Sequence, residues 1–150
     1  MNFTVLTIFP EMIEAFAGIG MLRRAIEKDL VSCSSVNIRD FAEGKHRVTD
    51  DRPYGGGAGM VMKPEPIARA IRSVKVLYPS SKTILLSPQG ASFSQKYARG
   101  LSKYDSLILV CGRYEGVDER VCHDLIDEEI SIGDFIMTGG ERPDVRVRRE

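Results

Sequence analysis

The chain has 150 residues, 43% of them hydrophobic, which is enough for one domain with its own core. Its 21 basic and 21 acidic residues give a formal net charge of zero, which excludes the strongly cationic surface of a sequence-blind nucleic-acid binder. No apolar run approaches the ~20 residues of a membrane span and no secretion signal precedes the first elements, so we expect a cytoplasmic protein without membrane contact.

The N-terminal part of the chain predicts strands alternating with helices. Residues 3–9 are rich in β-forming side chains and end at Pro10, where we expect a helix to begin, because proline at the first helical position lacks only an amide that would have no partner there. Helical spacing continues to about Asp29 after an interruption by two glycines. Residues 31–38 then alternate weakly, as an edge strand does.

A segment without sustained periodicity follows at residues 39–62. It is charged at first and then carries the sequence GGGAG at residues 55–59, which has neither the GxGxxG pattern nor the Gly-Lys-Ser/Thr of a phosphate-binding loop. We interpret it as a long substrate-facing loop, with disorder as the alternative. His46 lies between two basic residues, shortly before Asp50, and can contact phosphate or position a base; a solvated charged loop is an equally good interpretation.

Strands and helices alternate again in the rest of the chain. The pattern predicts a helix from Pro64 to about Tyr78, strands at 82–87, 106–111 and 129–132, a short helix at 94–101, and a helix capped by Asp118. Such alternation is typical of an α/β fold with a mostly parallel sheet and helices on both faces.

Three glycine-containing loops each follow a predicted strand, at residues 87–90, 112–116 and 131–140. The carboxyl ends of parallel strands share one edge of a sheet, so these loops should meet and hold a polar cofactor through backbone amides and carbonyls. The alternative is that the glycines only turn the chain. Glu115 is the strongest single candidate, because packing does not explain a carboxylate between two glycines at the end of a buried strand.

Four motifs in sequence carry a resemblance to a known family. They are DDRPYGGGAGM at 50–60, LSPQG at 86–90, VCGRYEGVDER at 110–120 and SIGDFIMTGGE at 131–141. Together they resemble the bacterial tRNA (guanine-N1)-methyltransferases, which belong to the trefoil-knotted SPOUT enzymes. The resemblance implies a homodimer whose sites use both subunits. It also implies methylation of the guanosine 3′ of the anticodon, with S-adenosylmethionine bound in a bent shape inside the knot.

The resemblance assigns roles to individual residues. It implies that the cofactor contacts Leu85, Leu86, Ser87, Pro88, Gly112, Tyr114, Glu115, Gly116, Ile132, Gly133, Phe135, Met137, Gly139 and Gly140. Glu115 would also face the target base or a magnesium ion. His46, Asp50, Gly59 and Arg113 would lie on the tRNA side.

The expected reaction needs particular chemistry from these side chains. Guanine N1 carries a proton at neutral pH, so methyl transfer needs a base, or stabilisation of negative charge on O6, together with alignment of N1 and the methyl group. We predict Asp50, Glu115 and Arg113 as catalytic residues, with Asp50 a candidate proton acceptor and Arg113 or magnesium a candidate to stabilise O6. Which carboxylate takes the proton is left open.

The sequence departs from the family pattern after Glu141. We expect residues 1–141 to be the S-adenosylmethionine-binding domain and residues 142–150 an atypical basic tail, without the family's threading helix and C-terminal tRNA-binding domain. The prediction is a methyltransferase impaired by truncation, with a knot that lacks its last helix. The alternative is a non-catalytic RNA-binding or dimerising remnant.

Overall fold

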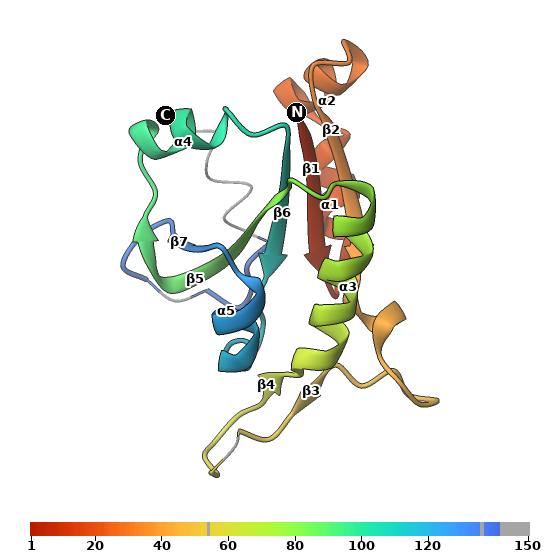
Figure 1. Ribbon diagram of the computed structural model, residues 1–150, viewed down its shortest axis with the longest axis vertical. Helices are drawn as coiled ribbons and strands as arrows, with labels where there is room; N and C mark the ends of the chain where they lie inside the picture. The colour runs from red at the N-terminus through yellow and green to blue at the C-terminus, as the bar shows by residue number, and fades with distance from the viewer. Residues whose placement is uncertain (54, 136, 142–150) are drawn as a thin grey trace.

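A five-stranded sheet forms the centre of the computed structural model, which describes residues 1–53, 55–135 and 137–141 (Figure 1). Its strands are β1 (Asn2–Thr7), β2 (Ser32–Asn37), β5 (Lys82–Ser92), β6 (Ser106–Cys111) and β7 (Glu128–Ser131). Their order is β2-β1-β6-β5-β7, and every pairing is parallel. The predicted α/β fold with a mostly parallel sheet is therefore confirmed.

The position of each strand in the sheet follows from its composition. β6 is central and reads SLILVC, and almost all of it is buried, as expected of a parallel strand covered on both faces. β2 reads SCSSVN, is only partly buried, and occupies an edge, as its weak alternation predicts.

Helices cover both faces of the sheet, and alternate residues of the strands meet them. On one face lie α3 (Pro64–Leu77) and α5 (Glu119–Leu125). There Ile108 of β6 shares a core cluster with Ile67 of α3 and Val121 of α5. On the other face Ile13, from α1 (Pro10–Ala17), packs with the β1 and β6 side chains. Leu107 packs near α4 (Gln95–Leu101).

The second face also carries an apolar cavity of about 340 Å³ between α1 and α4. Phe3, Phe16 and Leu101 are among the side chains that line it. The remaining helix, α2 (Gly20–Glu27), buries none of its residues. Across the described ranges no helix is both long and apolar enough to cross a membrane.

The segment at 39–62 contains more regular structure than its sequence predicts. It begins within the 3₁₀ helix η1 (Ile38–Phe41). Its second half is bounded by the antiparallel strands β3 (Asp50–Asp51) and β4 (Val61–Met62), which pair with each other. Two-residue strands leave no periodic signal in a sequence, because periodicity needs at least four residues to register. The expectation of an irregular loop is corrected to a loop closed by a short ladder.

The predicted loop at 87–90 lies inside β5 and not after its end. Pairing of β5 with β7 breaks after Leu86 and resumes at Ala91, which pairs with Ile130. Gly90 permits this irregularity, since a Cβ there would lie 2.5 Å from the carbonyl carbon of Glu129. Gly90, predicted to lie in a loop after the strand, is therefore a site of close approach between two strands.

Two predictions about the end of the chain are not tested by the described residues. The trefoil knot stays a prediction of the family resemblance. The basic tail at 142–150 lies outside the described ranges.

Candidate active site

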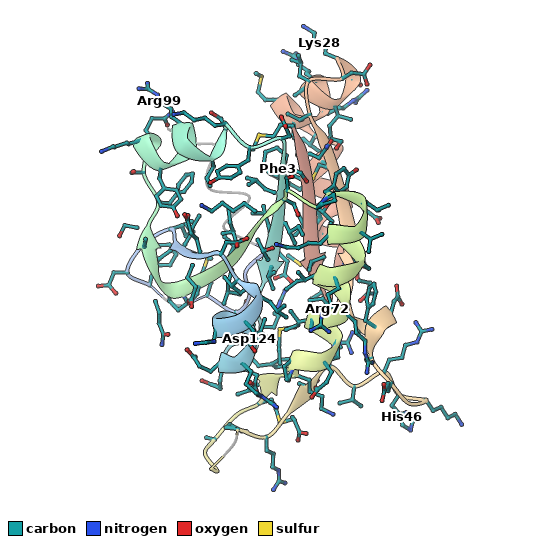
Figure 2. The ribbon with its side chains drawn as sticks, viewed as in Figure 1. Phe3, Lys28, His46, Arg72, Arg99 and Asp124 are labelled. Atoms are coloured by element: carbon teal, nitrogen blue, oxygen red, sulfur yellow. The ribbon has the colours of Figure 1, made fainter. Side chains whose placement is uncertain are left out.

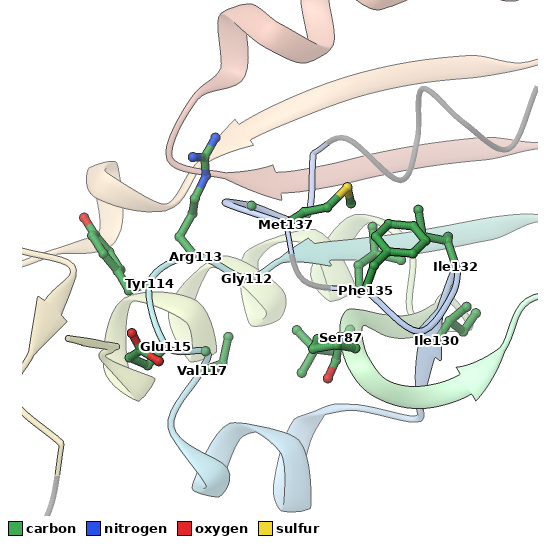
Figure 3. A pocket seen from close by; sticks show the side chains of 16 residues that line it. Ser87, Gly112, Arg113, Tyr114, Glu115, Val117, Ile130, Ile132, Phe135 and Met137 are labelled. Atoms are coloured by element: carbon green, nitrogen blue, oxygen red, sulfur yellow. The ribbon is translucent and has the colours of Figure 1, made fainter. Parts of the chain in front are cut away.

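A cavity of about 220 Å³ opens at the edge of the sheet where β6 and β7 end, beside the middle of β5 (Figure 3). The three predicted loops meet around it. The residues that line it are Leu85, Leu86, Ser87, Pro88, Gly112, Arg113, Tyr114, Glu115, Gly116, Val117, Ile130, Ile132, Phe135, Met137, Gly139 and Gly140. Every residue of the predicted cofactor set except Gly133 is among them.

The third loop folds back onto the second and closes one side of this cavity. Arg113 forms an antiparallel bridge with Gly139, and the Gly140 amide donates to the Gly112 carbonyl at 2.9 Å. A Cβ on Gly140 would lie 2.8 Å from the Cα of Cys111, so only glycine fits between these two backbones. The two loops therefore form one continuous wall.

The turn after β6 has the backbone strain that is common at functional sites. Tyr114 is a non-glycine residue with φ of 58°, and Gly116 has φ of 126°. These angles reverse the chain within a few residues and leave Glu115 exposed at the rim between them. The side chain of Tyr114 is 47% exposed, so the turn presents an aromatic ring and a carboxylate beside the cavity.

The end of the GGGAG segment and the residues that follow it contact this turn. The Glu115 amide donates to the Met60 carbonyl at 2.9 Å, and the Met62 amide donates to the Gly116 carbonyl at 3.0 Å. Gly59 touches the Glu115 side chain directly, because a Cβ there would lie 2.5 Å from its Cγ. The predicted substrate-facing loop is thus fixed against a carboxylate that lines the cavity.

The guanidinium of Arg113 points away from Glu115, toward the end of β1 (Figure 3). It donates to Glu141 Oε2 at 3.0 Å and to the Thr138 carbonyl at 3.1 Å, and it lies 4.5 Å from the centre of the Phe9 ring. The guanidinium of Arg113 is therefore bound by other groups of the protein, although Arg113 lines the cavity.

Two predicted tRNA-side residues are not brought to the cavity. His46 is exposed on a loop that projects from the body of the molecule (Figure 2). Asp50 pairs with Met62 in the β3–β4 ladder and does not line the cavity. Gly59, by contrast, is brought to Glu115.

Sequence reasoning missed two residues that line the cavity. Val117 follows the glycine turn and Ile130 lies in β7. Their apolar character gave only a packing signal, since nothing local distinguishes a side chain facing a cavity from one facing the core.

In the ranges that the structure describes, no group of three or more His, Cys, Asp or Glu side chains is placed to hold an ion. Glu115 alone does not hold magnesium, because this ion usually needs substrate oxygens and several waters in addition to one or two carboxylates. We therefore derive no catalytic step through magnesium.

Comparison with known proteins identifies the family. The model of a family described as tRNA (Guanine-1)-methyltransferase TrmD matches residues 1–148. The chain belongs to this family.

Individual relatives of the TrmD family are similar to this chain in sequence. A protein from Desulfatibacillum aliphaticivorans named tRNA (guanine-N(1)-)-methyltransferase is 58% identical over 141 residues, which are 94% of this chain and 54% of the relative. A relative of the same name from Dictyoglomus turgidum is 57% identical over 139 residues, covering 93% of this chain and 56% of the relative. The chain thus spans about half the length of the curated relatives it matches.

A solved structure supports the same family assignment. The crystal structure of tRNA (m1G37) methyltransferase from Aquifex aeolicus superposes with a TM-score of 0.89 at 42% identity, over 98% of this chain and 66% of that chain. At this identity the likeness extends beyond the fold to the family, and it covers all three loops of the cavity.

Proposed function

We propose that the chain methylates guanine N1 in tRNA, at the guanosine 3′ of the anticodon, with S-adenosylmethionine as methyl donor. The observation that carries the proposal is the meeting of three family motifs around one cavity that contains Glu115. Family membership supports the reaction type, and the motif pattern supports the substrate. We further propose residues 1–141 as the cofactor-binding unit.

The residues around the cavity suit this cofactor. Ile130, Ile132 and Phe135 offer apolar surface for an adenine ring, while the glycines of the second and third loops let the backbone come close to a ligand. A carboxylate at the rim suits a ligand with a positive sulfonium. When bound, S-adenosylmethionine supplies an electrophilic methyl group.

We propose that Glu115 is the group of this chain that acts on the target base. It lines the cavity and touches Gly59 of the substrate-facing loop, so it stands between the proposed cofactor and tRNA sides. A carboxylate there can accept the N1 proton of guanine as N1 takes the methyl group and the methyl–sulfur bond breaks, so that S-adenosylhomocysteine would leave as a neutral thioether. Asp50 lies outside the cavity, which favours a role for it in tRNA contact.

The partners follow from the same family resemblance. We propose tRNA as substrate, a homodimer as the working assembly and the cytoplasm as the location. His46 lies on the projecting loop and Asp50 follows it at the start of β3, and both can contribute contacts to tRNA phosphates or bases. Extruding the target base from a structured loop costs a few kcal/mol, which such contacts offset.

Methyl transfer to defined transcripts tests the proposal. The chain, and a chimera that continues it with the C-terminal half of the Desulfatibacillum aliphaticivorans relative, are incubated with labelled S-adenosylmethionine and a tRNA transcript carrying guanosine 3′ of the anticodon. A transcript with adenosine at that position is the control. We expect label at N1 of the guanosine only. Binding of tRNA without transfer by both proteins would instead support the non-catalytic alternative.

A further inference from the structure

A buried carboxylate outside the predicted catalytic set stands behind the wall of the cavity. The side chain of Glu141 is 1% exposed, and it does not line the cavity. Burying a charge is costly unless it is paired and hydrogen-bonded. Glu141 meets this requirement with two partners from distant parts of the chain.

The first partner of Glu141 is at the end of β1. The Thr7 hydroxyl donates to Glu141 Oε1 at 2.7 Å and accepts the Phe9 amide at 2.9 Å. Thr7 is fully buried, so both of these bonds are shielded from water. The end of β1 and the end of the third loop are thereby joined through a single side chain.

The second partner is Arg113, which belongs to the cavity wall. Its Nε donates to Glu141 Oε2 at 3.0 Å, and only 19% of its side chain is exposed. The Phe9 ring lies against the same guanidinium, 4.5 Å from its carbon. Thr7 therefore orders both the carboxylate and the aromatic neighbour of the arginine.

The ion pair lies directly over Gly139 and explains why that residue is glycine. A Cβ on Gly139 would be 2.5 Å from Arg113 Cζ and 2.5 Å from Glu141 Oε2. Gly139 and Arg113 line the cavity on their other side. Glu141 thus lies immediately behind the cavity wall and is joined to it through Arg113.

We infer that Glu141 is a positioning residue: with Thr7 it fixes Arg113, and through Arg113 it fixes the turn that presents Glu115 to the cavity. This inference rests on the proposed function for its relevance to cofactor binding. It also adds a structural role for Arg113, because a guanidinium held by Glu141, Thr138 and Phe9 supports the wall.

The test replaces Glu141 by an isosteric neutral residue. Glu141→Gln keeps the volume and an oxygen for Thr7 but removes the charge that holds Arg113. Affinity for S-adenosylmethionine is measured by calorimetry, and the amide resonances of Glu115 and Gly116 are followed by NMR. Loss of a charged hydrogen bond behind the site should weaken binding about tenfold. The two amides should shift even without cofactor.

The matched control is Glu128→Gln. Glu128 also forms a partly buried ion pair, with Lys82, but at the opposite end of β5 and β7. It should lower stability without changing cofactor affinity or the amides of the turn. Thr7→Val is the second variant if Glu141→Gln does not fold, since it removes only the hydroxyl. It should shift the Arg113 Nε–H resonance and weaken binding by a smaller factor.

The outcomes separate the inference from the proposed function. Wild-type affinity for S-adenosylmethionine in both Glu141→Gln and Thr7→Val, or turn amides that do not shift in them, would overturn the positioning role. Failure of the wild-type chain to bind S-adenosylmethionine would count against the proposed function, and the amide shifts alone would then decide whether Glu141 holds the turn.

Discussion

Gly59 and Glu115 meet at the boundary between the cavity and the substrate-facing loop. Gly59 has φ of 89° and no room for a side chain, and Glu115 has its amide bonded to the Met60 carbonyl. The pair therefore couples the GGGAG segment to the turn after β6. At the scale of single residues, the function proposed here depends on this contact and on the Glu115 carboxylate.

Gly59→Ala should displace the Glu115 side chain, because its methyl group would lie 2.5 Å from Glu115 Cγ. Gly44→Ala is the control, since Gly44 has a similar φ of 83° but nothing within 4 Å. Both variants carry the backbone strain of an L-residue at positive φ, of order 1 kcal/mol. We expect only Gly59→Ala to reduce methyl transfer beyond its effect on stability; equal loss in the two variants would contradict the contact.

Glu115→Gln should lower kcat about 100-fold or more, the usual contribution of a general base. Because Glu115 is exposed, the midpoint of thermal unfolding should not change. Glu119→Gln, four residues further on and outside the cavity, should leave kcat unaltered. Steady-state methylation kinetics measure kcat for the three proteins, and thermal melts measure their unfolding midpoints. A Glu115→Gln enzyme with wild-type kcat would remove Glu115 from the reaction.

At the scale of elements, the helix after the site begins on a charged cap. The Asp118 carboxylate accepts from the Arg120 amide at 3.0 Å and pairs with the Arg120 guanidinium at 2.9 Å. The backbone amide of Asp118 donates to the Met62 carbonyl at 3.1 Å, and this bond ties the start of α5 to β4. The hydrogen bond from the Arg120 side chain lowers the pKa of Asp118 below its ordinary value of 3.8.

This cap makes stability dependent on pH in a defined direction. The pKa of Asp118 is lower in the folded than in the unfolded state, so its carboxylate stabilises the fold when the pH is above the unfolded-state pKa. This stabilisation is lost as the pH falls through the folded-state pKa. Asp118→Ala should cost about 1 kcal/mol at neutral pH, and less in strong acid. Urea unfolding at several pH values measures this.

Ser94→Ala is the control for the acid dependence. Ser94 caps α4 by accepting from the Tyr97 amide but carries no charge. The cost of Ser94→Ala should therefore be similar at every pH. A cost of Asp118→Ala that does not fall in acid would show that the Arg120 contact is not electrostatic in origin.

At the scale of the whole molecule, local signals predicted most of the fold. The bounds of β6 and the Asp118 cap agree with expectation because both follow from neighbouring residues. The meeting of three loops was also predicted, because parallel strands bring their carboxyl ends to one edge. The shift in pairing at Gly90 was not, since it depends on the approach of β7, which is distant in sequence.

The network behind the cavity had no signal in the sequence. Thr7 and Glu141 are separated by 134 positions, and Arg113 and Glu141 by 28. Both separations are longer than any helix or strand of the described chain, so only the folded chain brings these side chains together. The role of Arg113 was assigned from a motif for the same reason, and its actual partners became visible only in three dimensions.

The location of the cofactor is tested most directly by titrating the isotopically labelled chain with S-adenosylmethionine and following backbone amide shifts by NMR. We expect the largest shifts at Gly112, Gly116 and Ile132, one from each end of the second loop and one from the third. Gly44, on the projecting loop, should not move. Shifts confined to residues outside the cavity, or no saturable shift at any cofactor concentration, would contradict the assignment of this cavity as the methyl-donor site.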